Sequence, residues 1–430
     1  MTARKQIHLA AHFPGVNNTT IWSDPLSGSQ IDFSSFEHFA ATAERGRFDF
    51  LFLAEGLRLR EHKGEIHDLD VVGRPDTLTV LAAVAAVTDR IGLVGTINTT
   101  FNEPFELARQ LASLELVSGG RSGWNIVTTN DAFTGENFRR GGYLDNADRY
   151  TRAAEFVDVA TALWAGNGAG NGAVNESRVE HHGDFFDVVG SLELPASPQG
   201  KPVILQAGVS DEGRDLAARY ADAIFSPFAD LATGRTFYAD IKSRLARFGR
   251  GDDDLKILPG AAFVLGDTEA EADERYRYER RAQVSGATSL RTVEAVWGRD
   301  LSGYDPDGPL PSIDLVVENV ELAAGRASVH KDRRGTALEW VERAAAAGLS
   351  IREVAIANLS RGVLVGTPTQ IADRIDEFVQ TEASDGFILV PSITPTGLDE
   401  FVDTVIPLLQ ERGSYRTDYE GTTLRQNLFA

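Results

Sequence analysis

The side chains best placed for chemistry are mostly neutral hydrogen-bonding groups at the ends of short apolar runs that are typical of buried strands. They are His12, Glu55, Thr96, Asn98, Asn125, Thr128, Thr129, Gln206, Ser210, Ser226 and Ser392, with Ala54 and Val209 beside them. This set holds one carboxylate and one histidine, whereas a glycosidase needs two carboxylates and a metallohydrolase needs several ligands. Neutral donors and acceptors favour a site for an organic cofactor that carries the chemistry itself.

Other catalytic patterns are weak or missing in the sequence. Adjacent residues of an extended segment point in opposite directions, so the pair His181-His182 indicates a solvated loop rather than a metal site. The chain has no cysteine, which excludes disulfides and thiolate nucleophiles or ligands. Neither a G-x-S-x-G nucleophile turn nor a nicotinamide-binding G-x-G-x-x-G is evident.

One stretch could hold a phosphate. In "LQAGVSDEGRDLAARYA", a strand runs through a glycine turn into a helix start, so backbone amides near Val209, Ser210 and Gly213 would point at one spot. A plain loop with Ser210 as helix cap explains the stretch equally well. Tyr150 could reach the same phosphate or could simply be half-buried on its helix.

The surrounding elements predict an α/β fold, a (β/α)8 TIM barrel with insertions. Eight near-continuous apolar runs alternate with amphipathic helices, a pattern typical of parallel strands buried on both faces. The runs are "IHLAAHF", "FDFLFLAE", "IGLVGTIN", "SGWNIVTT", "PVILQAG", "ADAIFSPF", "KILPGAAFVLG" and "GFILVPSI". In such barrels the carboxyl ends of the strands form the active site, so the side chains above are expected to meet there.

The chain is longer than a minimal barrel, so we expect one domain over 1–430 with insertions at about 165–200 and 286–362. The second insertion is expected to cover the mouth and influence specificity. Its residues His330, Lys331, Arg333 and Arg334 could bind an anion, although such a charge run more commonly marks a solvated face.

Composition narrows the setting. A net charge of −21 repels phosphate backbones, so nucleic acid is not an expected partner. No apolar run is long enough for a membrane span and the N-terminus lacks a signal-peptide pattern, which predicts a cytoplasmic protein. The chain has one methionine and no cysteine. This could reflect compositional drift, resistance to oxidation or selection for low sulfur use when sulfur is scarce. The last of these motivates the hypothesis of an organosulfur substrate.

The stretch "LVSGGRSGWNIVTT" shows how one segment divides its tasks. Its glycines are expected to end a helix and turn the chain sharply into a strand. Trp124 is expected to pack in the core. Strand alternation puts Asn125 and Thr129 on one face, so Thr129 rather than Thr128 is the predicted inward residue.

This segment, with "GTINTTFNEPFELARQLASLE" before it, resembles the bacterial-luciferase-like flavin monooxygenases. The resemblance is strongest to the branch of nitrilotriacetate monooxygenase, dibenzothiophene-sulfone monooxygenase and streptogramin A synthase. Further matching stretches include "ERGRFDFLFLAEGL", "PVILQAGVSDEGRDLAARYADAIF" and "YRTDYEGTTLRQNL". Together they cover nearly the whole chain.

The resemblance implies a homo-oligomeric barrel, a homodimer or homotetramer, that binds reduced FMN supplied by a separate NAD(P)H:flavin reductase. Reduced flavin and O₂ would give a peroxyflavin that oxygenates a small organic substrate. The implied flavin-contacting residues are Glu55 with neighbouring Ala54, Thr96, Asn125, Thr129, Asn146, Tyr150, Val209 and Ser210.

Some of these positions depart from the family pattern. The position of Glu55 is often Asp in the family, and Thr128-Thr129 replaces the usual Thr-Ser. Asn146 replaces a histidine, so this position carries no charge toward a phosphate. The Glu55 change keeps the acceptor and adds one methylene.

His12 is the candidate catalytic residue, because a strand-end histidine can donate a hydrogen bond or position a substrate. The alternative is a satisfied histidine at the barrel mouth. Two other functions stay open: an F420-dependent oxidoreductase that transfers hydride on the same barrel, and a flavin-binding protein without turnover.

Overall fold

The structure is a computed structural model. It describes residues 4–13, 20–59, 61–66, 75–129, 132–138, 146–166, 178–227, 230–312, 323–324, 332–359 and 362–430.

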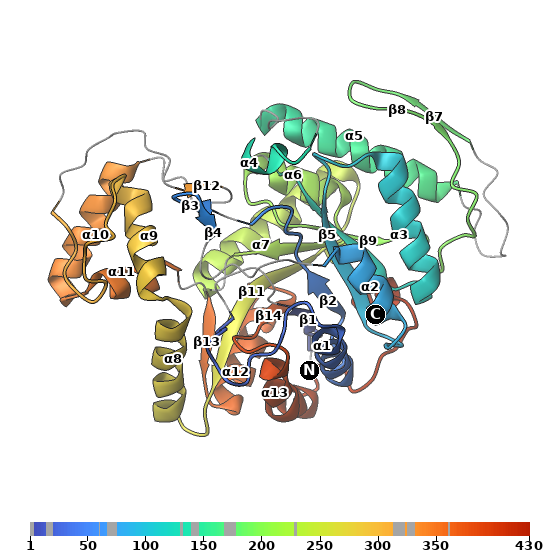
Figure 1. Ribbon diagram of the computed structural model, residues 1–430. Coiled ribbons are helices and arrows are strands. Elements are labelled where there is room, and N and C mark those ends of the chain that lie inside the picture. The colour runs from blue at the N-terminus through green and yellow to red at the C-terminus, as the bar shows by residue number, and fades with distance from the viewer. Residues whose placement is uncertain are drawn as a thin grey trace.

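Eight parallel strands close into a barrel (Figure 1). They are β1 (His8–His12), β2 (Phe50–Leu53), β5 (Gly92–Asn98), β6 (Ser122–Val127), β9 (Val203–Gln206), β10 (Ala223–Ser226), β11 (Lys256–Leu265) and β14 (Gly386–Val390). Neighbours pair in that order, and β14 pairs back with β1. The predicted (β/α)8 barrel is therefore confirmed, with all eight strands in the predicted segments.

Helices surround the barrel. They are α1 (Phe33–Arg45), α2 (Thr77–Ala85), α3 (Pro104–Ser118), α5 (Asn146–Ala165), α6 (Asp211–Tyr220), α7 (Leu231–Leu245), α8 (Glu269–Gln283), α12 (Pro368–Gln380) and α13 (Asp399–Glu411). Ser210 caps α6 by accepting from the Gly213 amide, as predicted, and Thr367 opens α12 with a capping box before Pro368. Short elements between them are α4 (Ala132–Gly135), η1 (Ala246–Phe248), η2 (Asp252–Asp254) and η3 (Thr396–Leu398).

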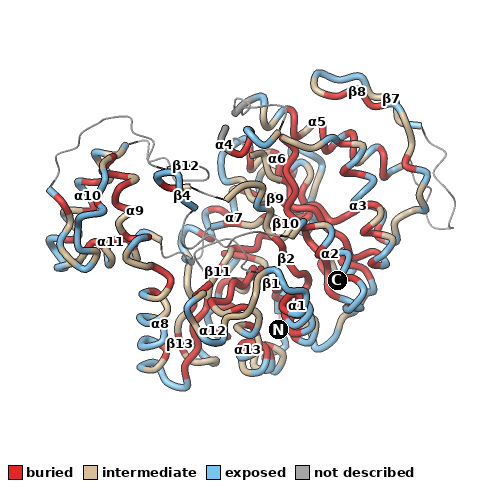
Figure 2. Tube along the Cα trace, viewed as in Figure 1, coloured by how far each residue is buried: buried red, intermediate tan, exposed pale blue. Residues whose placement is uncertain are grey.

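The strands of the barrel are buried along most of their length (Figure 2), and strand alternation divides their side chains into an inner and an outer layer. Phe50, Val94, Leu205 and Ile388 fill the interior of the barrel. Trp124 instead belongs to the outer cluster between strands and helices, where its indole nitrogen donates to the Ile97 carbonyl at 2.9 Å. The predicted core position of Trp124 is confirmed, and the opposite face of β6 is left for the interior.

The C-terminal tail closes the amino-terminal end of the barrel. Leu424 and Leu428 of α14 (Leu424–Leu428) belong to the interior cluster, and the Leu424 amide donates to the Gly120 carbonyl at 3.1 Å. Gly119 and Gly120 have φ values of 69° and 93°, so they end α3 and turn the chain into β6 as predicted. Ligands must therefore reach the barrel from its other, carboxyl end.

Several elements were not predicted from the sequence. β13 (Val363–Gly366) pairs with the far half of β11, which makes the sheet nine-stranded. β7 (Val179–His182) and β8 (Asp187–Gly190) form an antiparallel hairpin where a solvated loop was expected. This part of the prediction was wrong, because ladder hydrogen bonds order the segment.

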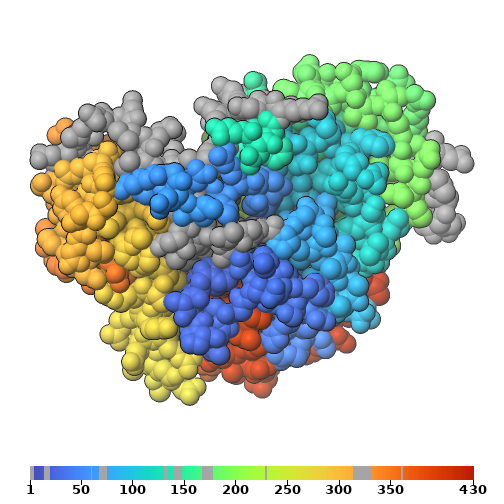
Figure 3. Space-filling model, in the orientation of Figure 1, coloured from blue at the N-terminus to red at the C-terminus, as the bar shows by residue number. Residues whose placement is uncertain are grey.

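A small helical bundle is formed by residues that lie between α8 and β13 in the sequence. It contains α9 (Gly286–Trp297), α10 (Arg333–Ala347) and α11 (Ile351–Leu359), and Trp297 and Trp340 pack in its centre. A three-stranded sheet joins it to the barrel: β12 (Ala323–Ala324) pairs with β3 (Glu61–His62), which pairs with β4 (Glu65–Ile66). Figure 3 shows the blue hairpin segment against the yellow and orange bundle.

An ion-pair cluster strengthens this junction. The His62 imidazole lies 2.5 Å and the Lys63 amine 2.9 Å from the buried carboxylate of Glu294 on α9. Arg333 and Arg334 begin α10, whereas His330 and Lys331 lie outside the described residues. Among the described helices, none combines the length and apolar character that a membrane crossing requires.

Candidate functional site

Thr96 and Asn125 form a polar pair inside the barrel wall. They occupy matched positions on the neighbouring parallel strands β5 and β6, so their side chains lie side by side. The Asn125 amide nitrogen donates to the Thr96 hydroxyl at 3.0 Å, and both residues are buried. The Asn125 carbonyl oxygen is buried and accepts no hydrogen bond from the described residues. A buried acceptor without a donor is costly, and it fits a ligand that brings an N–H group.

Glu55 lies just beyond β2, next to Ala54. Its carboxylate accepts from the backbone amide of Asn98 at 3.1 Å and from the Asn98 side chain at 2.9 Å. Asn98 in turn accepts from the Phe101 amide at 2.7 Å. The hydrogen bonds hold Glu55 at the mouth, and Ala54 packs against the interior cluster.

The stretch after β9 brings a tight loop against the start of α6. A Cβ on Gly213 would lie 3.0 Å from the Gly208 Cα and 3.1 Å from the Tyr150 hydroxyl. The Ser210 hydroxyl donates to the Tyr150 hydroxyl at 3.2 Å and accepts from the Gly213 amide at 3.2 Å. Glycine therefore leaves a small cradle between two hydroxyls and a helix N-terminus, a geometry suited to a phosphate.

Three further residues lie close to Ser210 or Tyr150 along the chain. Val209 is 39% exposed, and Asn146 is the first residue of α5, four positions before Tyr150. The Arg149 guanidinium lies 5.0 Å from the centre of the Tyr150 ring. Arg149 was not predicted as a site residue, and it places a positive charge beside Tyr150.

His12 is the last residue of β1 and is buried at the mouth. Its ring meets Phe52 edge to face, with centroids 5.2 Å apart, and Phe52 stacks on Phe225 inside the barrel. These aromatic rings form an apolar floor below the mouth. The histidine therefore borders a dry interior on one side and the open end of the barrel on the other.

Thr129 follows β6, and its carbonyl accepts from the Thr100 hydroxyl at 2.9 Å. Thr128 and Thr129 are both half-buried. Because β6 ends at Val127, strand alternation no longer fixes which threonine faces inward. The inward orientation of Thr129 stays a prediction.

Most residues predicted for the cofactor, together with His12, lie on or just after adjacent strands of the closed barrel. In strand order these strands are β1, β2, β5, β6 and β9, which form a continuous arc of the mouth, whereas Asn146 and Tyr150 belong to α5. The arc carries polar groups for a flat ring system in its middle and a phosphate cradle at one end. The buried carbonyl of Asn125 and the cradle at Gly213 both fit FMN.

A family model described as luciferase-like monooxygenase matches residues 15–385. The chain belongs to this family. It is 38% identical to the N-acetyl-S-(2-succino)cysteine monooxygenase of Bacillus subtilis (strain 168), over 99% of this chain and 96% of the relative. It is also 38% identical to nitrilotriacetate monooxygenase component A of Aminobacter aminovorans, over 100% and 97% of the two chains.

A crystal structure of a long-chain alkane monooxygenase superposes with a TM-score of 0.80 at 28% identity, over 100% of this chain and 96% of that one. The resemblance to the luciferase-like monooxygenases, the barrel and the assignment as an enzyme are therefore confirmed.

Two histidines once considered for metal binding have separate partners in this luciferase-like monooxygenase. His181 lies 3.0 Å from the Glu155 carboxylate, and His182 lies 2.9 Å from the Asp187 carboxylate. Their burial alternates along β7, so the two rings project to opposite faces of the hairpin, as the sequence predicted.

The inner face of α8 carries site candidates that the sequence did not reveal. Glu279, Arg280 and Gln283 are buried or half-buried although all three are strongly polar. Burial raises the pKa of Glu279, and the hydroxyl of Ser392 beyond β14 opposes that effect. A charged helix of the sequence "EAEADERYRYERRAQ" normally indicates a solvated surface, so no local signal separated this face.

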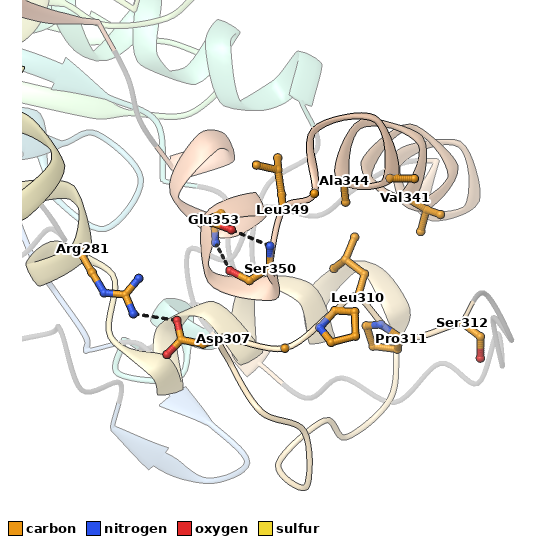
Figure 4. Close-up of a pocket in the computed structure, with 14 residues that line it drawn as sticks. Arg281, Asp307, Leu310, Pro311, Ser312, Val341, Ala344, Leu349, Ser350 and Glu353 are labelled. Atoms are coloured by element: carbon orange, nitrogen blue, oxygen red, sulfur yellow. Dashed lines mark hydrogen bonds and ion pairs between the residues drawn. The ribbon is translucent and has the colours of Figure 1, made fainter.

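A cavity of about 730 Å³ lies elsewhere, between α10, α11 and the segment 305–312 (Figure 4). Leu310, Val341 and Leu349 line it, and the Arg281–Asp307 ion pair of 2.9 Å lies at one side. None of the residues predicted for the cofactor borders this cavity, so we do not assign the cofactor to it.

Proposed function

We propose that this luciferase-like monooxygenase is the oxygenase component of a two-component system. It takes FMNH₂ from a separate NAD(P)H:flavin reductase and uses O₂ to oxygenate a small organic substrate. The observation that carries the proposal is the polar arc from β1 to β9. It combines the buried Asn125 oxygen, which accepts no hydrogen bond from the described residues, with a cradle at Gly213 that suits a phosphate.

The middle of the arc and the cradle at its end have separate tasks. Thr96 and Asn125 present hydrogen-bonding groups to the edge of the flavin ring, and Glu55 adds an acceptor that Asn98 holds in place. The hydroxyls of Ser210 and Tyr150, with the N-terminus of α6, hold the phosphate. Bound FMNH₂ supplies the reaction with O₂, so the protein does not need a nucleophile or a metal of its own.

The protein's further contribution is a dry, shaped space. Phe52 and Phe225 close the floor below the flavin ring, and α14 closes the far end of the barrel. Water is excluded from the ring, which protects a reactive oxygen species from hydrolysis or release. His12 at the rim donates a hydrogen bond or positions the substrate.

The substrate is an organosulfur compound in the more specific form of the proposal. Two observations support it: a chain with one methionine and no cysteine, and relatives named for N-acetyl-S-(2-succino)cysteine and for dibenzothiophene sulfone. A gene expressed only when sulfate is scarce is the expected corollary, and unchanged expression under sulfate starvation would contradict it.

The test is oxygen incorporation. The purified protein is combined with FMN, NADH, a generic flavin reductase and ¹⁸O₂, and a panel of thioethers, sulfones, amines and carboxylates is examined by mass spectrometry. The expected result is one ¹⁸O atom in a product, dependent on every component. Tight FMN binding without product from any panel member would indicate a flavin-binding protein without turnover, and hydride transfer from reduced F420 would indicate the deazaflavin alternative.

A further inference from the structure

The last turns of α8 lie at the rim of the barrel mouth. β11 has ten residues, and only its first seven pair with β10 and β14. The strand therefore extends beyond the rim before α8 begins and returns (Figure 1). The contact between Glu279 and Ser392, two residues past β14, places this end of the helix beside the carboxyl end of the barrel.

This rim position lies across the mouth from the phosphate cradle. In the closed strand order, β14 is three positions from β9 in one direction and five in the other. A charged group on this side therefore lies on a different part of the rim from the cradle. β1, which carries His12, is the direct neighbour of β14.

Arg280 is a buried arginine in this region. Its side chain belongs to a residue that is only 9% exposed, and its Nε and Nη2 atoms donate to no acceptor among the described residues. Burial lowers the pKa of Arg280, and the nearby Tyr276 and Glu279 side chains offset this effect only in part. The ring of Tyr276, 5.6 Å from the guanidinium carbon, offers only a weak cation–π contact.

Another buried arginine shows what a structural guanidinium looks like in this fold. Arg121, at the opposite end of the barrel, is 3% exposed. It donates five hydrogen bonds, to the carbonyls of Ala85, Thr88, Ile91 and Ser118 and to the Thr88 hydroxyl. Arg280 has no such set, although both arginines are buried to a similar degree. A structural role therefore accounts for Arg121 but not for Arg280.

A second donor close to Ser392 also lacks an acceptor. The Ile21 amide donates to the Ser392 carbonyl at 2.8 Å, which brings the adjacent Trp22 to the same part of the rim. The indole nitrogen of Trp22 is buried and donates to none of the described residues. The Glu279 carboxyl group is a charged neighbour of Arg280, and it opposes the effect of burial on the pKa of Arg280. Its Oε2 atom, like the Nε and Nη2 atoms of Arg280, has no hydrogen-bond partner among the described residues.

We propose that Arg280 binds an oxyanion of the substrate, a carboxylate or a sulfonate, at the rim opposite the phosphate cradle. The proposal rests on the proposed function and makes it more specific: the substrate carries a negative charge at a fixed distance from the atom that is oxygenated. Arginine suits this task because its planar guanidinium binds two oxygens of one anion at once. The anion also gives the unpaired donors of Arg280 and Trp22 their missing acceptor.

The test compares Arg280→Gln with Arg281→Gln. Arg281 is the next residue on α8, but its side chain is 55% exposed and pairs with Asp307 on the outer side, so it controls for loss of one positive charge. Succinate, tricarballylate and ethanesulfonate are titrated into the FMN-loaded proteins by calorimetry, with succinamide as the neutral counterpart of succinate. The carboxylates and the sulfonate distinguish the two kinds of oxyanion.

We expect at least one anion to bind the wild type and Arg281→Gln, and to bind Arg280→Gln about 10- to 100-fold more weakly, as for loss of a hydrogen bond to a charged group. Succinamide is expected not to bind. Three results would each overturn the proposal: no anion binds the wild type, Arg280→Gln binds anions as well as the wild type does, or succinamide binds as tightly as succinate.

Thermal unfolding without ligand separates binding from folding. If the role of Arg280 is to bind a ligand, Arg280→Gln removes a buried charge whose Nε and Nη2 atoms have no acceptor among the described residues. The Tm of this variant is therefore expected to equal or exceed that of the wild type. A lower Tm than that of Arg281→Gln would mean that Arg280 stabilises the fold. FMN affinity, measured on the same samples, tests the proposed function separately, because Arg280 lies away from the cradle.

Discussion

Removing the hydroxyl of Tyr150 is expected to weaken FMN binding while leaving the barrel intact. The Ser210 hydroxyl donates a hydrogen bond to the Tyr150 oxygen at 3.2 Å and accepts one from the Gly213 amide at 3.2 Å. The proton of Tyr150 is therefore the free donor at the end of this chain, and it is available to a phosphate oxygen. In Tyr150→Phe, the phosphate loses that donor and Ser210 loses its acceptor.

The size of the effect follows from the type of bond. A hydrogen bond to a charged acceptor contributes about 1.5–3 kcal/mol, so the Kd for FMN is expected to rise roughly 10- to 150-fold. The half-buried position of Tyr150 favours the lower part of this range, because water competes for the phosphate. Quenching of flavin fluorescence measures the oxidised cofactor, and anaerobic titration measures FMNH₂.

Tyr220→Phe is the matched control. Tyr220 is also a helical tyrosine, but its hydroxyl donates to the Asp158 carboxylate at 2.8 Å on the outer side of the barrel. Its loss is expected to leave FMN affinity within about twofold of the wild type. If Tyr150→Phe binds FMN as tightly as Tyr220→Phe does, the phosphate does not lie in the cradle, and the assignment of Tyr150 and Ser210 fails.

Two further changes test the middle of the arc and the base of the barrel. Asn125→Leu removes a buried acceptor that has no donor among the described residues, so flavin-free stability should change by less than about 1 kcal/mol in urea unfolding, while FMN affinity falls about tenfold. Burial raises the pKa of Asp49, but Arg416 and His8 outweigh this effect and hold the value below its usual 3.8. The unfolded chain then binds the proton more readily, so the contribution of Asp49 is fully present above pH 3.8 and is lost as the pH falls through the folded pKa. Asp49→Asn is expected to cost about 3–5 kcal/mol at pH 7 and to flatten the loss of stability in acid, measured by urea unfolding at several pH values; equal stability of the two proteins at pH 7 would contradict it.

The barrel was predictable because its burial leaves a strong mark on the sequence. A strand covered by helices outside and side chains inside is apolar on both faces, so runs such as "ADAIFSPF" stand out against the amphipathic helices. Because active sites of such barrels lie at the carboxyl ends of the strands, Thr96 and Asn125 were predicted as site residues before their contact was known. The structure places them in register with a hydrogen bond of 3.0 Å. Periodicity and topology together were sufficient here.

The short sheets were not predictable in the same way. β3 and β12 have two residues each and are joined by the pairing of His62 with Ala323, far apart in the sequence. No local propensity marks a two-residue strand, because its stability depends on a distant partner. β7 and β8 show the same limit: the glycine-rich context suggested a solvated loop, whereas antiparallel pairing orders the segment.

The buried polar face of α8 could not be predicted from the sequence, because charged residues are normally exposed. The sequence alone assigns neither Arg121 nor Arg280 to the interior, since a charged residue is rarely buried. The structure buries both, but five hydrogen bonds stabilise only Arg121. A buried guanidinium lowers stability where its donors lack acceptors, as the Nε and Nη2 atoms of Arg280 do among the described residues. We therefore propose that Arg280 serves binding rather than folding, because its surroundings depart from the ordinary rules of burial at the carboxyl end of the barrel.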